Sequence, residues 1–214
     1  MGRNIRRAAG YAAAAVLAAL AVVGALGLEI AQNNPFQPGS ARPAFPVRGL
    51  SAPDFVLTDQ NGKPVDLSRW RGHVVVLGFM AAGSGQSVAP ARVLQAARDD
   101  LGRAAAAVRW ALVNTNPFAT DVAAARHTAE AARLRDIRFL TGPAPVLLAV
   151  WQAYHVDVAP AGGRIVYTSP VYVIDASGRE VDARLIDPGA TGAARVVAEG
   201  RTLAAMIRSA ERRP

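Results

Sequence analysis

Residues 73–80 read His73-Val74-Val75-Val76-Leu77-Gly78-Phe79-Met80, an apolar run rich in β-branched side chains. Such a run is typical of a central parallel strand that is buried on both faces. Similar short runs lie at 108–113 and 137–140, and the segments 89–101 and 121–134 between them have the apolar spacing of helices. Strands that alternate with helices in this way predict an α/β fold that contains parallel strand pairs.

The flanking segments predict two hairpins and two more helices. Residues 55–58 alternate like a strand, a turn signal follows at 59–62, and 65–67 forms the short partner strand. Further on, the patterns predict a helix at 146–154, strands at 165–167, 171–174 and 181–186, and a last amphipathic helix at 193–209. This order resembles a thioredoxin-like fold, with a mixed central sheet flanked by helices and an N-terminal β-hairpin.

An uncharged segment near the N-terminus predicts a membrane anchor. Residues 8–28 carry no charge, and at about 1.5 Å per residue they reach about 31 Å, enough to cross a bilayer core. Arginines precede this segment and Glu29 follows it, so the positive-inside rule keeps residues 1–7 in the cytoplasm. We therefore expect a single-pass protein of the cell membrane with an extracytoplasmic domain. A signal peptide cleaved at 25–27 is the alternative.

The segment 29–49 predicts a tether between this anchor and the domain. It carries four prolines, and that density allows neither a regular helix nor a strand. The domain itself is expected at 50–214, and the membrane, through residues 8–28, is its first expected partner.

The composition excludes whole classes of chemistry. The chain has no cysteine, which excludes disulfides, iron–sulfur clusters, thiol nucleophiles and dithiol redox catalysis. Three histidines and three methionines leave few ligands for a soft metal. The net charge is +8, but Lys63 is the only lysine and the arginines are scattered without a basic-aromatic stripe, so we expect no nucleic-acid partner.

Several segments together resemble the SCO/SenC family. The matching stretches are 52–62, 66–77, the Phe-Leu-Thr-Gly segment at 139–142 with 150–154, and the Val-Tyr-Thr-Ser-Pro-Val-Tyr-Val-Ile-Asp segment at 166–175. The resemblance spans about residues 50–210. It implies a membrane-tethered thioredoxin fold, copper as the cargo, and partners among the respiratory oxidase or its assembly proteins.

The positions of the family's copper ligands are occupied by other residues. The family carries Cys-x-x-x-Cys-Pro after the first central strand. Counting from Phe79 places these cysteines at Ser84 and Val88, whereas counting back from the proline places them at Gly85 and Ala89. The family's ligand histidine falls on Tyr167. We therefore expect no metal, no catalytic residue and a non-enzymatic role, with copper suggested by the resemblance alone.

Two alternatives stay open. The first is a copper-delivery protein with an unconventional site, built from Met80, Tyr167 and the histidines His73, His127 and His155. The second is a thiol-free module in which the loop from Ser84 to Ser87, at a helix N-terminus, binds an anion or supports hydrolysis. The nearby carboxylates Glu180 and Asp182 lie beside a turn, where solvent-exposed side chains are the ordinary expectation.

Overall fold

The computed structural model describes residues 49–83, 87–161, 164–186 and 192–212. The chain divides into two units, Met1–Ala44 and Phe45–Pro214. The predicted anchor at 8–28 and nearly all of the tether at 29–49 lie outside the described residues. Within the described ranges, none of the helices combines the length and the apolar character needed to span a bilayer.

A mixed sheet forms the centre of the second unit. Within the described residues its strand order is β1-β10-β9-β4-β5-β6-β2-β3, and β7 pairs with β8 in a separate ribbon. The strands are β1 Leu50–Ser51, β2 Val56–Asp59, β3 Pro64–Asp66, β4 Val75–Met80, β5 Arg109–Asn114, β6 Arg138–Thr141, β7 Val158–Ala161, β8 Arg164–Tyr167, β9 Pro170–Ile174 and β10 Arg179–Leu185. Strands β4, β5 and β6 run parallel, and the other pairs are antiparallel.

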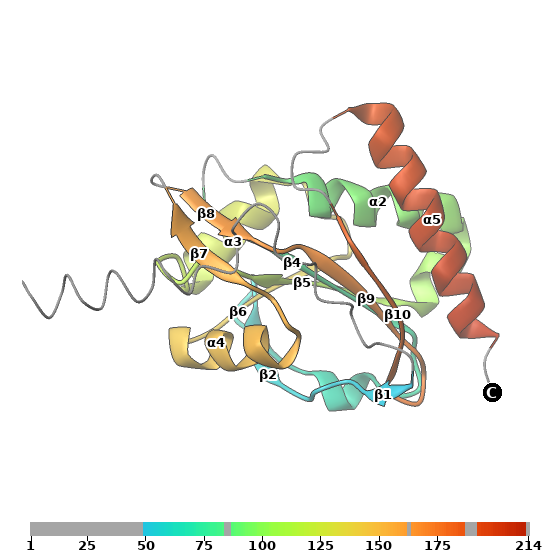
Figure 1. Cartoon of the computed structure of the whole chain (residues 1–214), viewed down its shortest axis with the longest axis horizontal. Helices are drawn as coiled ribbons and strands as arrows, with labels where there is room; N and C mark the ends of the chain where they lie inside the picture. Colours follow the sequence, from blue (N-terminus) through green and yellow to red (C-terminus); the bar gives the residue numbers. More distant parts are fainter. Residues whose placement is uncertain (1–48, 84–86, 162–163, 187–191, 213–214) are drawn as a thin grey trace, which may run out of the picture. The chain divides into compact units, whose positions relative to one another are not determined.

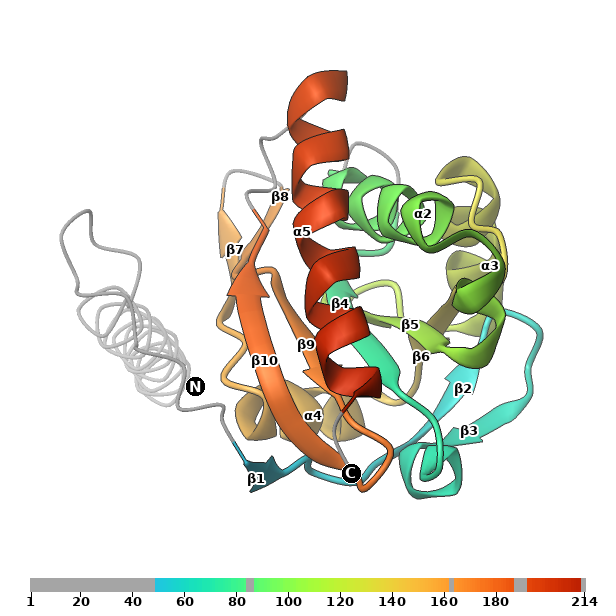
Figure 2. The same cartoon turned by 90° about the vertical axis from the view of Figure 1, so that its right-hand side faces the viewer.

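Helices cover both faces of this sheet. Helices α2 and α5 lie on one side and α4 lies on the other, as Figures 1 and 2 show from two directions. The helical elements are the 3₁₀ turns η1 Leu67–Trp70 and η2 Gly102–Ala107, and the helices α2 Ala89–Leu101, α3 Val122–Ala131, α4 Ala144–Ala153 and α5 Ala193–Glu211.

Each face of the sheet has its own hydrophobic core. The core on the α2 side includes Val76, Leu94 and Leu203, and α3 contributes Ala125 to it. The core on the α4 side is more aromatic and contains Phe55, Trp70, Phe79, Trp151, Tyr154 and Tyr172. Because consecutive residues of β4 enter opposite cores, the strand is apolar at every position, as the run at 73–80 predicts.

Helices α2 and α5 approach each other unusually closely. A Cβ atom at Gly200 of α5 would lie 2.5 Å from the Cβ of Ala96 in α2, and 2.9 Å from the backbone carbon of Ala96. Because the two small residues face each other, the helix backbones come nearer than larger side chains allow.

The thioredoxin-like α/β fold is confirmed, and some boundaries differ from the expected ones. Helix α3 ends at Ala131 rather than at 134, because Arg133 takes a left-handed backbone (φ 53°) and the Leu134 N–H bonds back to Ala129. Helix α4 begins at Ala144, two residues earlier than expected. The prediction left out Pro145, although a proline is tolerated in the first helical turn.

Two strands were not expected from sequence. Strand β1 has only two residues, and β7 reads Val-Ala-Pro-Ala, which shows no alternation. Tertiary pairing alone makes them strands, since β1 lies against β10 and β7 against β8.

The parallel strands β4, β5 and β6 give the sheet two distinct ends. We name the end where these strands finish the carboxyl edge, and the end where they begin the amino edge. The loop after β4 leaves from the carboxyl edge. We name Ser84, Gly85, Val88, Ala89 and Tyr167, where the sequence resemblance places the family's ligands, the family-site positions. The residues Arg109 and Arg138, which open β5 and β6, lie at the amino edge.

Candidate functional site

The loop after β4 is held to its neighbours by hydrogen bonds. Ala82 is fully buried; its N–H donates to Asn114 Oδ1 at 2.9 Å, and its carbonyl accepts from Asn116 Nδ2 at 2.8 Å. One residue on, the Gly83 N–H donates to Thr128 Oγ1 at 3.1 Å. The backbone at Gly83 has a φ of +110°, a conformation that L side chains rarely adopt, so this position favours glycine.

Asn114 organises this polar cluster. Its Oδ1 also accepts the Asn116 N–H at 2.8 Å, and its Nδ2 donates to the carbonyl of Ala119 at 2.7 Å. The side chain is fully buried, so each of these bonds replaces water that cannot enter. These hydrogen bonds fix the path of the loop from the end of β4 as far as Gly83.

The sequence contained a signal for this cluster that pattern reading missed. Strand β5 is apolar up to Val113 and then continues Asn114-Thr115-Asn116. Polar residues that follow directly on a buried strand need hydrogen-bond partners, and the backbone of a neighbouring loop can supply them. Thr128 gave no such signal, because its contact with Gly83 depends on how α3 packs.

Tyr167 lies beside the start of this loop. It ends β8, is only 6% exposed, and forms a small buried cluster with Ala81 and Ile165. Among the described residues its hydroxyl has no hydrogen-bond partner. Burial raises the pKa of Tyr167 to about 12, and the nearby Ala81 amide opposes that rise. The phenol therefore stays neutral at physiological pH and fills space beside the first residues of the loop.

The other family-site positions that the structure describes, Val88 and Ala89, lie at the start of α2. Val88 is half-buried and precedes the helix, and Ala89 is its buried first residue. Ser84 and Gly85 lie outside the described residues. Neither Val88 nor Ala89 carries a donor atom, and Tyr167 offers only a hard oxygen. This set does not fit Cu(I), which prefers thiolate, thioether and imidazole ligands.

The start of α2 offers few donors to an anion. Pro90 has no N–H, and the Ala89 N–H already donates to Ser87 Oγ at 3.3 Å. The Arg92 N–H is engaged by the carbonyl of Val88. An anion-binding or hydrolytic site at Ser84–Ser87 would therefore depend mainly on residues 84–86.

The residues proposed for an unconventional copper site lie on separate elements. His73 precedes β4 at the amino edge, where Arg109 Nη2 lies 2.9 Å from its Nε2. His127 is exposed on α3, and His155 is exposed just after α4. Met80 is fully buried in the core on the α2 side, whereas Tyr167 belongs to a different cluster. In the described ranges no three His, Cys, Asp or Glu side chains group as a metal site requires.

Glu180 is buried, in contrast to the expected solvent exposure. It is 7% exposed in β10, and burial raises its pKa to about 7. Burial, and secondarily the charge of Glu180, also raises the pKa values of Tyr154 and Tyr172. Both phenols donate to backbone carbonyls, Tyr154 to Pro53 at 2.8 Å and Tyr172 to Tyr154.

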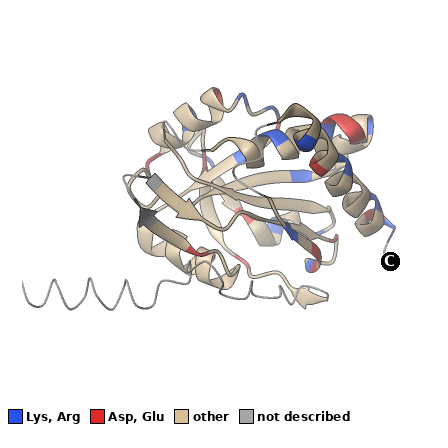
Figure 3. Cartoon of the chain, turned by 45° about the horizontal axis from the view of Figure 1, so that its top comes forward, with Lys and Arg blue, Asp and Glu red and all other residues tan. Residues whose placement is uncertain are grey.

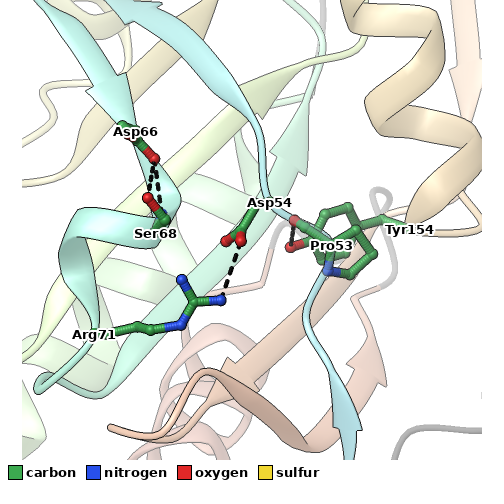
Figure 4. Close-up of polar contacts among 6 residues, drawn as sticks. All are labelled: Pro53, Asp54, Asp66, Ser68, Arg71 and Tyr154. Atoms are coloured by element: carbon green, nitrogen blue, oxygen red, sulfur yellow. Dashed lines mark hydrogen bonds and ion pairs between the residues drawn. The ribbon is translucent and has the colours of Figure 1, made fainter.

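Side-chain contacts fasten the segments before β2 and before η1. Figure 4 shows the Tyr154 hydroxyl on the Pro53 carbonyl, and next to it the ion pair between Arg71 and Asp54 at 3.0 Å. Asp66 caps η1 by accepting from the Ser68 N–H at 3.0 Å and from its hydroxyl at 2.6 Å. The contacts of Pro53 and Asp54 anchor the chain entering β2 onto the α4 side of the sheet.

Comparison with known proteins places these features in a family. Solved structures with similar folds include copper-bound ScoI of Arabidopsis thaliana (16% identity, 75% of this chain and 99% of that chain, TM-score 0.59). Copper-bound ScoI of Bradyrhizobium japonicum is also similar (21% identity, 75% and 99% coverage, TM-score 0.53). A third is BsSco, described as a member of the Sco family of cytochrome c oxidase assembly proteins (16% identity, 76% and 94% coverage, TM-score 0.60).

At these identities the solved structures establish the fold. No curated protein matches the chain. The SCO1/SenC family model matches residues 47–202, which covers most of the chain and nearly all of the described domain. The stretches that resemble this family in sequence, from 52 to 175, all lie within that match. The chain belongs to the SCO1/SenC family.

Proposed function

We propose that this chain is a membrane-anchored, extracytoplasmic SCO1/SenC protein that has lost the copper and redox site of its family and acts as a non-catalytic binding partner in cytochrome oxidase assembly. The observation that carries the proposal is the absence of cysteine from a chain that keeps the family's fold. At Tyr167, where the sequence resemblance places the family's histidine, the phenol is neutral.

The retained polar cluster supports a role for the loop other than metal binding. Asn114, Asn116 and Thr128 hold the start of the loop through three hydrogen bonds of 2.8 to 3.1 Å. Each bond removes conformational freedom from a loop that has no ligand donor at its described family-site positions. A fixed start of the loop favours its use as a binding surface, because it lowers the entropy lost on association.

Exposed apolar side chains lie on the segments that follow β5 and β6, and they would form the contact area of this surface. Phe118, after β5, is 79% exposed, and in α4, which follows β6, Val146 is 39% and Leu148 is 50% exposed. Because β5 and β6 both end at the carboxyl edge, these segments leave the sheet at the same end as the loop after β4. Aromatic and aliphatic side chains on a rigid scaffold suit contact with another protein.

Metal binding tests the first half of the proposal. Purified full-length chain in detergent is equilibrated with Cu(I) under reducing, anaerobic conditions, and separately with Cu(II). Bound metal is then measured after gel filtration. We expect less than 0.1 equivalent, about the level of nonspecific retention, since the chain has no thiolate and its described histidines and Met80 lie on separate elements. One tightly bound equivalent would refute the loss of the site.

Oxidase assembly tests the second half. Deleting the gene in its own host should lower the amount of assembled cytochrome oxidase, measured by difference spectroscopy of membranes. A copy that carries Phe118→Ser and Leu148→Ser should fail to restore it, whereas Val197→Ser, an exposed position on α5, should restore it fully. An unchanged oxidase level after deletion would remove the assembly role.

A further inference from the structure

A second concave surface lies at the amino edge, away from the family-site loop. A cleft of about 670 Å³ is lined by the β2–β3 turn, by η1, by the end of α2 with η2, and by the first residues of β5 and β6. This volume is in the range of small-molecule sites, roughly 300–1,000 Å³. The described family-site positions Val88, Ala89 and Tyr167 do not contribute to it.

Basic side chains outnumber acidic ones around this cleft. Its lining includes Lys63, Arg98, Arg109 and Arg138, against Asp59 and Asp136. Arg98 is neutralised by Asp136 at 2.9 Å, and its guanidinium lies over Trp110, 5.4 Å from the ring centre. In the described part of the chain, Lys63, Arg109 and Arg138 form no ion pair with a carboxylate. The other basic residues are spread over helices and strands (Figure 3).

The two arginines of this group are already oriented. The guanidinium of Arg138 lies over the Trp70 ring, 5.5 Å from its centre. Arg109 Nη2 lies 2.9 Å from His73 Nε2, which must be the acceptor because a guanidinium only donates. Both contacts use a ring or a neutral nitrogen rather than a carboxylate, so the remaining N–H groups stay available to an oxyanion.

The β2–β3 turn holds Lys63 beside the cleft. Asp59 is 3% exposed, and its Oδ1 accepts the N–H groups of Asn61 and Lys63 at 2.8 and 2.9 Å. Gln60 Oε1 accepts the Phe139 N–H at 2.8 Å, which fastens the turn to β6 beside Arg138. The Asp59 carboxylate is thus engaged by backbone amides instead of pairing with the lysine.

We propose that this cleft binds a phosphate-bearing anion. Three like charges around one cavity repel each other, and a multiply charged oxyanion removes that repulsion while accepting from two guanidinium groups and an ammonium. The volume exceeds that of a single phosphate, so the cleft has room for an attached organic group beside the indole rings. The phosphate belongs either to a free phosphorylated compound or to an anionic lipid headgroup. This inference is independent of the assembly role.

Thermal unfolding of the full-length chain in nonionic detergent, followed by tryptophan fluorescence, tests the proposal in two arms. The first arm adds inorganic pyrophosphate. The second adds dihexanoylphosphatidylglycerol, with dihexanoylphosphatidylcholine as its neutral counterpart. At saturation we expect the midpoint to rise by about 5 °C or more in at least one arm. A rise with pyrophosphate alone identifies a free compound, and a rise with phosphatidylglycerol alone identifies a lipid headgroup.

Matched variants separate the cleft from general charge. Lys63→Gln, Arg109→Gln and Arg138→Gln together should abolish the rise, whereas Arg92→Gln, Arg103→Gln and Arg201→Gln, which change the charge equally at exposed positions, should preserve it. Lys63→Gln alone, at an exposed turn, should weaken binding about tenfold without affecting folding. Equal shifts in all proteins, or a shift with polyglutamate and none with either phosphate probe, would overturn the proposal.

Discussion

The backbone N–H of Ala82 donates a hydrogen bond of 2.9 Å to the side-chain oxygen of Asn114, which ends the neighbouring strand β5. One amide side chain thereby fixes the exit of the loop that carries the family-site positions. The bond joins two parallel strands at the carboxyl edge, and both residues are fully buried. The loop's position therefore depends on β5 as much as on β4.

Removing this side chain should destabilise the domain. Asn114→Ala leaves the N–H groups of Ala82 and Asn116 buried without an acceptor, at a cost of about 3 kcal/mol in the free energy of unfolding. Urea denaturation followed by circular dichroism measures the change. Asn61→Ala, at an exposed turn position, is the control and should change stability by less than about 0.5 kcal/mol. Equal urea midpoints for the two variants would contradict the role of Asn114.

Restoring the family ligands should restore copper binding if the scaffold is retained. Two variants test the two possible registers: Ser84→Cys with Val88→Cys and Tyr167→His, and Gly85→Cys with Ala89→Cys and Tyr167→His. We expect one of them to bind one equivalent of Cu(I), because thiolates and imidazole suit this ion. Bound metal after anaerobic gel filtration identifies the register. Tyr167→His alone is the control, and failure of both triple variants would show that the loop no longer has the family geometry.

Glu180 should make stability depend on pH. Burial raises its pKa from 4.5 to about 7, so the folded protein holds this proton to higher pH than the unfolded chain does. Its contribution is therefore complete below pH 4.5 and is lost as the pH rises to about 7. The loss should amount to about 2–3 kcal/mol in the free energy of unfolding.

The variant Glu180→Gln tests this directly. It cannot ionise, so it should be more stable than the wild type at pH 8 and nearly equal to it at pH 4.5. Urea midpoints at both pH values provide the measurement. Glu130→Gln, on the exposed side of α3, should follow the wild type at both. A wild-type profile in Glu180→Gln would show that Glu180 is not the group responsible.

The close approach of α2 and α5 predicts a steric effect. Gly200→Val would place a branched side chain where even a Cβ lies 2.5 Å from Ala96, so the helices must separate. We expect a loss of about 2–3 kcal/mol and a lower thermal midpoint. Gly192→Ser is the control, because nothing lies within 4 Å of a Cβ there and serine suits the N-cap of α5. An unchanged midpoint for Gly200→Val would mean that the pair tolerates separation.

Local patterns predicted most of the secondary structure. The run at 73–80 predicted β4 because its residues are apolar on both faces, and the spacing of Val93, Leu94, Ala97 and Leu101 predicted α2 with its observed bounds. The short strands β1 and β7 escaped prediction because only their partners make them strands. The burial of Glu180 was not predicted, because closeness to a turn in the sequence does not show which residues cover β10.

The sequence by itself determined the α/β class and the absence of cysteine ligands, because these depend on residue type and on periodicity along one segment. Tertiary structure alone decided the Asn114 cluster, the burial of Glu180 and the basic cleft at the amino edge. Each of these joins residues from strands that are far apart in the chain. Such contacts arise from strand order and register, which no local pattern encodes.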